Sequence, residues 1–171
     1  MPGSSKILPF LLLAASFAAC DEIVTYPDTP VIDYKSFSLY STTDTLGNRI
    51  LQGTIEFTFT DGDGDVGLSQ PSDTVQQPDT VKYNLFTSLY DFKDGEFKKI
   101  SGIVGEQKFR IPYMERTGQN KTLKGTVTVD LQYFEPITYD TVFYTFYMTD
   151  RSYHHSNTDT TDVIVFTGLD L

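Results

Sequence analysis

Apolar side chains recur at every second position along most of this chain, and this alternation restricts it to a fold made of strands. Between residues 50 and 60, Ile55, Phe57 and Phe59 alternate with polar or charged residues. Successive side chains of a strand point to opposite faces of the sheet, so such a segment buries one face and exposes the other. No segment shows the period of a convincing amphipathic helix. We therefore predict an all-β fold.

The pattern divides the chain beyond residue 31 into seven or eight strands separated by turn residues. The predicted strands cover residues 32–41, 50–60, 81–92, 97–100, 108–113, 123–134, 141–149 and 161–167. Lys93-Asp94-Gly95-Glu96 is a hairpin turn signal between two of them. The strand at 141–149 is apolar on both faces, so we place it centrally. Strands of this number and spacing predict one antiparallel β-sandwich, with a small barrel as the alternative.

The N-terminus has the order of a secretory signal. A short polar stretch with one cation, Lys6, precedes an almost wholly apolar run over residues 7–19. This run of about 13 residues is too short for a transmembrane helix, which needs roughly 20. It ends in Phe17-Ala18-Ala19 before Cys20, the only cysteine of the chain. A single cysteine excludes an intramolecular disulfide, so the fold depends on its core.

Small residues directly before a lone cysteine resemble the lipobox of bacterial lipoproteins, although that family usually has Leu where Phe17 stands. The resemblance implies that residues 1–19 are removed and that Cys20 receives acyl chains that anchor the protein in a membrane. The alternative is an ordinary cleaved signal with an incidental cysteine. Residues 20–31 contain Pro27 and Pro30 and predict an extended tether, which leaves residues 32–171 for the domain. We expect a cell-envelope protein of the outer membrane, on its periplasmic or surface face.

The strand order and the closing stretch from Thr149-Asp150-Arg151 to Ser156-Asn157 resemble immunoglobulin-like and fibronectin-type modules of bacterial envelope lipoproteins. The resemblance covers residues 32–171 and implies a fold without implying a function. In such a sandwich, the loop after the second strand and the loop before the last strand lie at the same end. These loops are residues 61–67 and 150–157.

The first of these loops carries the most distinctive motif of the chain, Asp61-Gly62-Asp63-Gly64-Asp65-Val66-Gly67. Carboxylates at every second position can turn oxygens toward one point, glycine permits the tight backbone, and oxygen ligands suit Ca²⁺. The motif resembles the first half of an EF-hand loop. However, Val66 and Ser72 stand where that loop has glycine and a bidentate glutamate, so it is no EF-hand.

Two hypotheses stay open for this motif. In the first, Ca²⁺ binds Asp61, Asp63 and Asp65, and Asp150, Asn157 or a nearby carbonyl completes its coordination. In the second, the motif is a plain acidic turn, because Asp and Gly are common turn formers. Asp150 then pairs with Arg151 or caps a turn.

Other chemistry has weaker support in the sequence. His154 and His155 are the only histidines, and adjacent residues of a strand point to opposite faces, so we predict no zinc site. The chain has no nucleophile elbow, phosphate-binding loop or dinucleotide fingerprint, and we expect no catalysis.

A second pattern is the repeated triplet of Asp, Thr and an aliphatic residue. It resembles an O-glycosylation sequon that some Gram-negative bacteria use on exported proteins. The resemblance implies these acceptors: Thr45, Thr74, Thr80, Thr141 and Thr160. The alternative is compositional, because Asp ends turns and Thr opens strands.

The net charge of −10 predicts no nucleic-acid partner, because an acidic protein repels phosphates. We predict a lipid-anchored binding or scaffolding domain whose partner, protein or glycan, the sequence leaves open. The alternative is a carbohydrate-binding accessory lipoprotein of a glycan-uptake system. That function requires exposed aromatic side chains that form a stacking platform, and in the absence of Trp the candidates are Tyr90, Phe92, Tyr113 and Tyr153.

Overall fold

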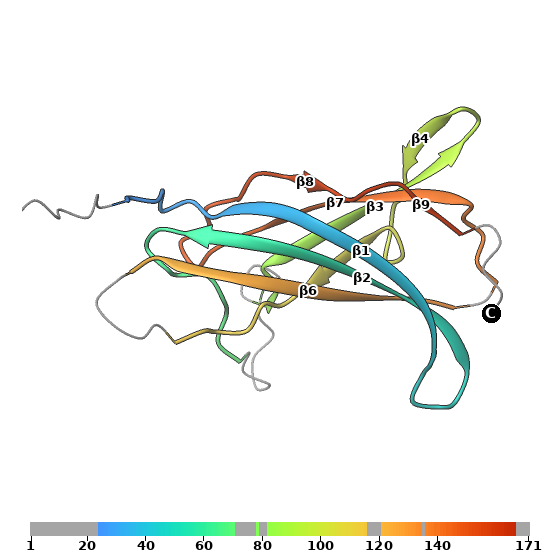
Figure 1. Cartoon of the computed structure of the whole chain (residues 1–171), viewed down its shortest axis with the longest axis horizontal. Coiled ribbons are helices and arrows are strands. Elements are labelled where there is room, and N and C mark those ends of the chain that lie inside the picture. The colour runs from blue at the N-terminus through green and yellow to red at the C-terminus, as the bar shows by residue number, and fades with distance from the viewer. Residues whose placement is uncertain (1–23, 71–77, 79–81, 116–120, 135, 167–171) are drawn as a thin grey trace, which may run out of the picture.

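The described part of the chain forms two antiparallel sheets that pack together as a β-sandwich (Figure 1). The computed structural model describes residues 24–70, 78, 82–115, 121–134 and 136–166. The first sheet, in the order β1-β2-β6, contains β1 (Val31–Thr43), β2 (Arg49–Asp61) and β6 (Leu123–Tyr133). The second, in the order β4-β3-β7-β8, contains β3 (Leu85–Lys93), β4 (Glu96–Lys99), β7 (Thr141–Met148) and β8 (Asp159–Thr160). Two short strands extend it, since β5 (Glu106–Phe109) pairs with β3 and β9 (Ile164–Val165) pairs with β7.

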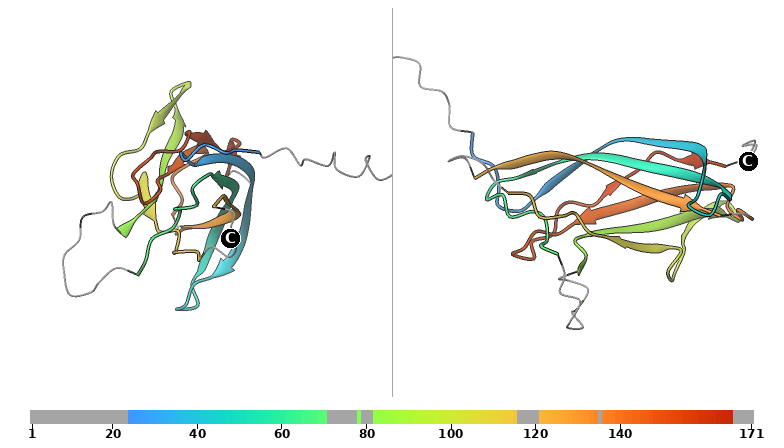
Figure 2. Two further views of the ribbon diagram at one scale, coloured as in Figure 1. Left: turned by 90° about the vertical axis from the view of Figure 1, so that its left-hand side faces the viewer. Right: turned by 90° about the horizontal axis from the view of Figure 1, so that it is seen from below.

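The two sheets form separate layers, which Figure 2 shows from below. The layer of β1, β2 and β6 covers the layer of β3 and β7, so each sheet has an inner and an outer face. The predicted all-β sandwich is therefore confirmed. Its strand order is compatible with the predicted immunoglobulin-like arrangement, and that finer assignment stays a prediction. Among the described residues, no helix has the length and apolar character needed to cross a bilayer.

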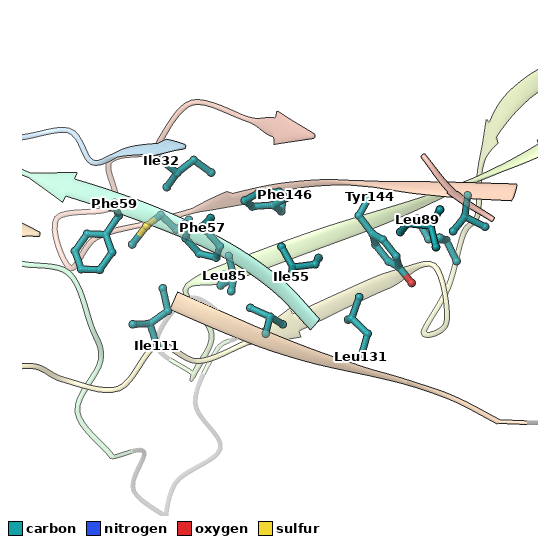
Figure 3. Close-up of a cluster of buried hydrophobic side chains, with 14 of the residues drawn as sticks. Ile32, Ile55, Phe57, Phe59, Leu85, Leu89, Ile111, Leu131, Tyr144 and Phe146 are labelled. Carbon is teal, nitrogen blue, oxygen red and sulfur yellow. The ribbon is translucent and has the colours of Figure 1, made fainter. Parts of the chain in front are cut away.

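The core lies between the sheets, and the alternation of β2 supplies its centre (Figure 3). Ile55, Phe57 and Phe59 are each no more than 3% exposed, as their spacing predicts. Phe57 packs against Phe146 of β7 with ring centroids 5.1 Å apart, so this pair joins the two sheets. Full burial of an aromatic side chain stabilises a fold by roughly 1.5–3 kcal/mol.

β7 lies between β3 and β8 in the second sheet, in the central place that its two apolar faces predict. Its inner face is buried in the core. Its outer face places Phe143 against Tyr90 of β3, with ring centroids 4.7 Å apart and ring planes 4° from parallel. Tyr147 stacks on Phe86 in the same way, with centroids 5.1 Å apart. The outer face of this sheet is therefore lined with stacked aromatic rings.

The β3–β4 hairpin closes at the predicted turn. Asp94 and Gly95 both have positive φ angles, of +57° and +86°. A two-residue turn with both residues in the left-handed region matches the twist of the flanking strands, and Asp-Gly is one of its preferred sequences. This hairpin projects from the body of the sandwich in Figure 1.

Two predicted strands are displaced along the chain, and the contacts of Asn84 and of Leu68 account for the two displacements. β3 starts at Leu85 because the buried Asn84 side chain faces the backbone of Ile111, whose N–H it accepts at 2.7 Å. The partner strand β5 ends at Phe109, short of the predicted 108–113, because the chain beyond it pairs with Leu68 through an isolated bridge to Pro112. Beyond Phe109, pairing with the loop at Leu68 therefore replaces pairing within the sheet.

The predicted last strand, 161–167, forms only in part: among its described residues, 161–166, it contains β9, while β8 lies just before its predicted start. A break separates these two short strands. Thr161 lies at the break, and its Oγ1 accepts a hydrogen bond of 3.0 Å from the N–H of Tyr144 in β7. A side chain thus takes the place of one backbone partner in the ladder, which interrupts the strand.

The outer edge of β1 is closed by side chains of β8 and of the loop just before it. Asn157 accepts a hydrogen bond from the N–H of Ile32 at 2.8 Å and donates one to its C=O at 2.9 Å. Asp159 accepts a hydrogen bond of 2.7 Å from the N–H of Tyr34. These contacts satisfy backbone groups that an edge strand otherwise leaves open.

Candidate functional site

An acidic cluster lies at the end of the sandwich where β2 finishes, at the left of Figure 1. Asp61 is the last residue of β2, Asp65 lies four residues further on, and Asp150 follows β7 in the other sheet. Each offers one carboxylate oxygen, and these three oxygens lie within 4.8 Å of one another. The predicted meeting of the two loops is confirmed. The remaining predicted ligand, Asp63, lies in the same loop but outside this group.

Asp61 is the most deeply buried member, with no exposed surface. Its Oδ2 accepts a hydrogen bond of 2.8 Å from the N–H of Asp65, whereas its buried Oδ1 has no hydrogen-bond donor. Burial raises the pKa of Asp61 to about 6; the bond from Asp65 opposes this shift, and the charges of Asp63 and Asp65 add to it. Burial of a carboxylate oxygen without a hydrogen-bond donor destabilises the fold, and a bound cation would offset that cost.

Asp65 repeats this arrangement. Its Oδ2 accepts a hydrogen bond of 2.7 Å from the hydroxyl of Ser152, and its Oδ1 is buried without a hydrogen-bond donor. The backbone C=O of Asp65 accepts a bond of 3.3 Å from the N–H of Arg151. The two loops are therefore tied together by hydrogen bonds beside the cluster.

Asp150 is 2% exposed and is bonded to the turn that follows it. Its Oδ1 accepts the backbone N–H of His154 at 2.8 Å, and its Oδ2 lies 2.8 Å from Nδ1 of the same histidine. This hydrogen bond, together with the charge of Asp150, raises the pKa of His154. Asp150 thus caps a turn, as the plain-turn hypothesis expects, while it also belongs to the cluster.

Arg151 and two glycines fix the path of the first loop. The guanidinium of Arg151 donates hydrogen bonds of 3.3 and 3.2 Å to the carbonyls of Val66 and Gly67, and it lies 5.1 Å from the ring centroid of Tyr113. Gly64 and Gly67 have positive φ angles of +67° and +95°. A Cβ at Gly67 would also lie 3.0 Å from the Cα of Tyr113, so the loop requires glycine there.

This chemistry fits a hard divalent cation. The cluster presents oxygen ligands, and two of its buried oxygens, on Asp61 and Asp65, lack a hydrogen-bond donor. Ca²⁺ accepts six to eight oxygens in flexible geometry, including carbonyls and waters, so an irregular loop can surround it. The imidazole of His154 points its Nδ1 at Asp150 instead of offering a nitrogen ligand to the cluster.

The other predicted site residues lie elsewhere. Asn157, predicted as a possible further ligand, bonds the backbone of Ile32 instead, because it fills the β1 edge. His155 stacks on Tyr147 with centroids 5.3 Å apart. The lipidation residue and two of the glycosylation candidates lie outside the described residues: Cys20, Thr74 and Thr80. The remaining glycosylation candidates lie within the described residues. Thr45 and Thr160 are exposed, and Thr141, at the start of β7, is half-buried.

The aromatic side chains proposed for a glycan platform do not share one face. Tyr90 and Phe92 lie on the outer side of β3, whereas Tyr113 and Tyr153 lie beside the acidic cluster. The ring of Tyr90 is parallel to that of Phe143 and stacks against it, so each ring covers a face of the other. A sugar needs free ring faces, and this arrangement offers fewer of them than a coplanar platform.

A groove of about 790 Å³ lies between β5 and the connection from β6 to β7. Its walls include the exposed apolar side chains of Ile103, Val104 and Phe134. Glu106 is the single acidic residue among the described residues that line the groove, and its carboxylate forms an ion pair with Lys99 at 2.6 Å. The described lining therefore lacks the pair of carboxylates that a glycosidase uses.

Sequence reasoning missed Ser152, the contacts of Arg151 with the first loop, and the groove. A serine in a polar loop carries no signal of its partner, because the bond to Asp65 joins positions 87 residues apart. The sequence suggests only a pairing of Arg151 with Asp150, its neighbour in the chain.

The chain matches no protein-family model, no curated protein and no solved structure.

Proposed function

We propose that this chain is a lipid-anchored protein of the cell envelope whose β-sandwich is a non-catalytic binding or scaffolding domain that holds Ca²⁺ at the acidic cluster. The observation that carries the calcium site is the buried Oδ1 of Asp61, which has no hydrogen-bond donor and lies in a group of three carboxylates. A cation at this point supplies the missing partner.

Electrostatics supports an ion at this place. Carboxylates held close together in a partly buried site repel one another, and their attraction to a divalent cation is strong for the same reason. The donors are oxygens, which favours Ca²⁺ or Mg²⁺ over zinc. Ca²⁺ fits better, because Mg²⁺ demands near-ideal octahedral geometry and retains its water.

The role of this ion is structural. Asp61 and Asp65 belong to the loop that leaves the first sheet, and Asp150 belongs to the loop that leaves the second. An ion shared among them joins the two sheets at one end of the sandwich. It also orders the loop surface around Tyr113 and Tyr153, where a ligand would be sought first.

A thermal melt tests the calcium site. The chain from residue 20 onward, with Cys20→Ser, is melted in EDTA and in millimolar Ca²⁺. At a free concentration 100-fold above the dissociation constant, Ca²⁺ raises the free energy of unfolding by about 2.7 kcal/mol, which corresponds to a shift of several degrees. Asp61→Asn should abolish the shift, whereas Asp140→Asn, at an exposed aspartate outside the cluster, should retain it. Identical melts of the unsubstituted chain in both buffers contradict the proposal.

The lipid anchor requires a separate test, because Cys20 lies outside the described residues. The sequence feature that supports the anchor is the apolar run that ends at the single cysteine of the chain. Bacteria that express the full chain with a labelled fatty acid should yield labelled protein in the membrane fraction, and Cys20→Ala should lose the label. An unlabelled wild-type protein contradicts the anchor and leaves the calcium site untouched.

A further inference from the structure

The segment that leads into β1 lies directly on the loop of residues 61–67, which we call the acidic loop. We call residues 24–30 the leading segment; Figure 1 shows it entering β1 at the end of the sandwich where β2 finishes. The N–H of Gly62 donates a hydrogen bond of 2.9 Å to the C=O of Pro27. A Cβ at Gly62 would collide with the C=O of Tyr26 and would lie 2.6 Å from that of Pro27. Glycine at this position is what lets the two backbones touch.

A second contact holds the same segment from β6. Lys124 Nζ bonds the hydroxyl of Tyr26 at 2.6 Å and lies 3.8 Å from the centroid of its ring. A cation near an aromatic face is attracted by the ring as well as by the hydroxyl. The leading segment is therefore held at two points, one on the acidic loop and one on the neighbouring strand.

The first of these points is covalently coupled to the acidic cluster. Gly62 directly follows Asp61, and the side chain of Asp61 bonds the N–H of Asp65 at 2.8 Å across the loop. An ion bound by both carboxylates fixes the backbone between them, and so fixes the direction of the Gly62 N–H. Removal of the ion leaves the repulsion among the carboxylates of the cluster unopposed, so we expect the loop to open and the bond from Gly62 to Pro27 to weaken.

We propose that the acidic cluster and the leading segment form a latch, in which a divalent cation at Asp61, Asp65 and Asp150 locks residues 24–30 onto the sandwich. This inference rests on the proposed calcium site and adds a regulatory consequence. The bound ion sets how firmly the sandwich is held against the segment that leads to its N-terminal anchor. The free ion concentration thus determines whether the domain is fixed or swings on that segment.

Thermodynamic linkage makes the latch reciprocal. If the ion strengthens docking of the leading segment by some factor, docking must strengthen ion binding by the same factor. Couplings of this kind are typically about 5- to 150-fold. A variant that undocks the segment without touching a carboxylate should therefore weaken Ca²⁺ binding by that factor.

The test uses the chain from residue 20 onward with Cys20→Ser, and reads the Gly62 amide and the leading segment by NMR. Ca²⁺ should slow exchange of the Gly62 N–H about 5- to 150-fold. Backbone order parameters of Tyr26 and Asp28 should rise from below about 0.6 toward about 0.85. Calorimetry on the same samples gives the Ca²⁺ affinity.

Two variants undock the segment in different ways. Gly62→Ala introduces the backbone collision, and Lys124→Gln removes the contact from β6 while leaving the acidic loop unchanged. Both should lower the order parameters in Ca²⁺ and weaken Ca²⁺ binding, whereas Lys121→Gln, at an exposed lysine, should change neither. If Gly62→Ala fails to fold, Lys124→Gln still decides the question.

The outcomes separate the latch from the calcium site. Calcium binding with unchanged Gly62 exchange and unchanged order parameters overturns the latch and leaves the proposed function standing. Unaltered affinity in a Lys124→Gln variant whose segment has become mobile also overturns it, because linkage requires both effects. Absence of any calcium binding overturns the latch and the proposed calcium site together.

Discussion

The hydroxyl oxygens of Tyr133 and Tyr144 lie 2.9 Å apart between the two sheets, where each is the other's hydrogen-bond partner. Both side chains are buried. Burial raises the pKa of Tyr144 to about 12 and raises that of Tyr133 as well, so both hydroxyls remain protonated at neutral pH. This pair is a polar contact within an otherwise apolar part of the core.

Removing one hydroxyl of this pair should destabilise the fold, and removing the second as well should add less than its own single loss. Tyr144→Phe leaves the Tyr133 hydroxyl buried without a partner, which lowers the free energy of unfolding by about 1–3 kcal/mol. The double variant with Tyr133→Phe should lose less than the sum of the two single losses. Urea denaturation of the four proteins measures the coupling; Tyr40→Phe, at an exposed tyrosine, serves as control. Additive losses would show that the hydroxyls do not interact.

The pH dependence of stability should report Asp61 directly. Its pKa is about 6 in the fold, against about 3.9 in the unfolded chain. The folded state therefore binds the proton more tightly, and in EDTA the stability from this group is present below about pH 4 and lost as the pH rises through 6. The loss amounts to about 1–3 kcal/mol.

Asp61→Asn isolates this contribution from other groups that titrate in the same range. Melts of both proteins in EDTA between pH 4 and 7 should converge at low pH and diverge toward pH 7, where the variant is the more stable. In Ca²⁺ the order should reverse, because the neutral amide of Asn binds the ion more weakly than the carboxylate does. Parallel curves for the two proteins in EDTA would mean that Asp61 titrates normally.

Ser152 should contribute to ion affinity through Asp65. Its hydroxyl holds Oδ2 of that carboxylate at 2.7 Å and so orients it toward the cluster. Loss of such a supporting contact typically weakens metal binding about 10- to 100-fold. Calorimetric titration of Ser152→Ala with Ca²⁺ should show this loss, and Ser101→Ala, at an exposed serine, should not. Equal affinities of the two variants would remove Ser152 from the site.

Two glycines with similar backbone angles should respond differently to alanine. Gly67 and Gly47 have φ angles of +95° and +86°, but only Gly67 has neighbouring atoms where a Cβ would lie. Gly47→Ala should cost about 1–2 kcal/mol for the left-handed backbone. Gly67→Ala should cost more and weaken Ca²⁺ binding, because the acidic loop must shift. Equal unfolding free energies for the two variants would exclude the collision.

The alternating pattern predicted the fold, because burial of one sheet face is a local property of the sequence. Ile55, Phe57 and Phe59 indicated their own strand and its inner face before any partner was known. The Asp94-Gly95 turn was predictable for the same reason, since two adjacent residues determine it. The break between β8 and β9 was not, because it depends on the hydrogen bond that the N–H of Tyr144, in β7, donates to the side chain of Thr161.

The candidate site was predictable to the extent that topology brings loops together. The motif itself predicted Asp61 and Asp65 as ligands. Asp150 was predicted from the rule that these two loops lie at the same end of a sandwich. The contact between Gly62 and Pro27 could not be predicted. A glycine next to an aspartate signals a turn, and nothing in the sequence shows that another stretch of backbone lies against it.

The closed edge of β1 also has a mechanical consequence. β1 pairs with β2 from Val31, opposite Thr60, to Thr43, opposite Arg49. A force applied to residue 30 along the axis of this strand loads the whole ladder in shear, together with the side-chain bonds from Asn157. Because shear loads these bonds together, they do not break one after another. The lifetime of the folded domain under tension then depends on its unfolding rate and not on its equilibrium stability.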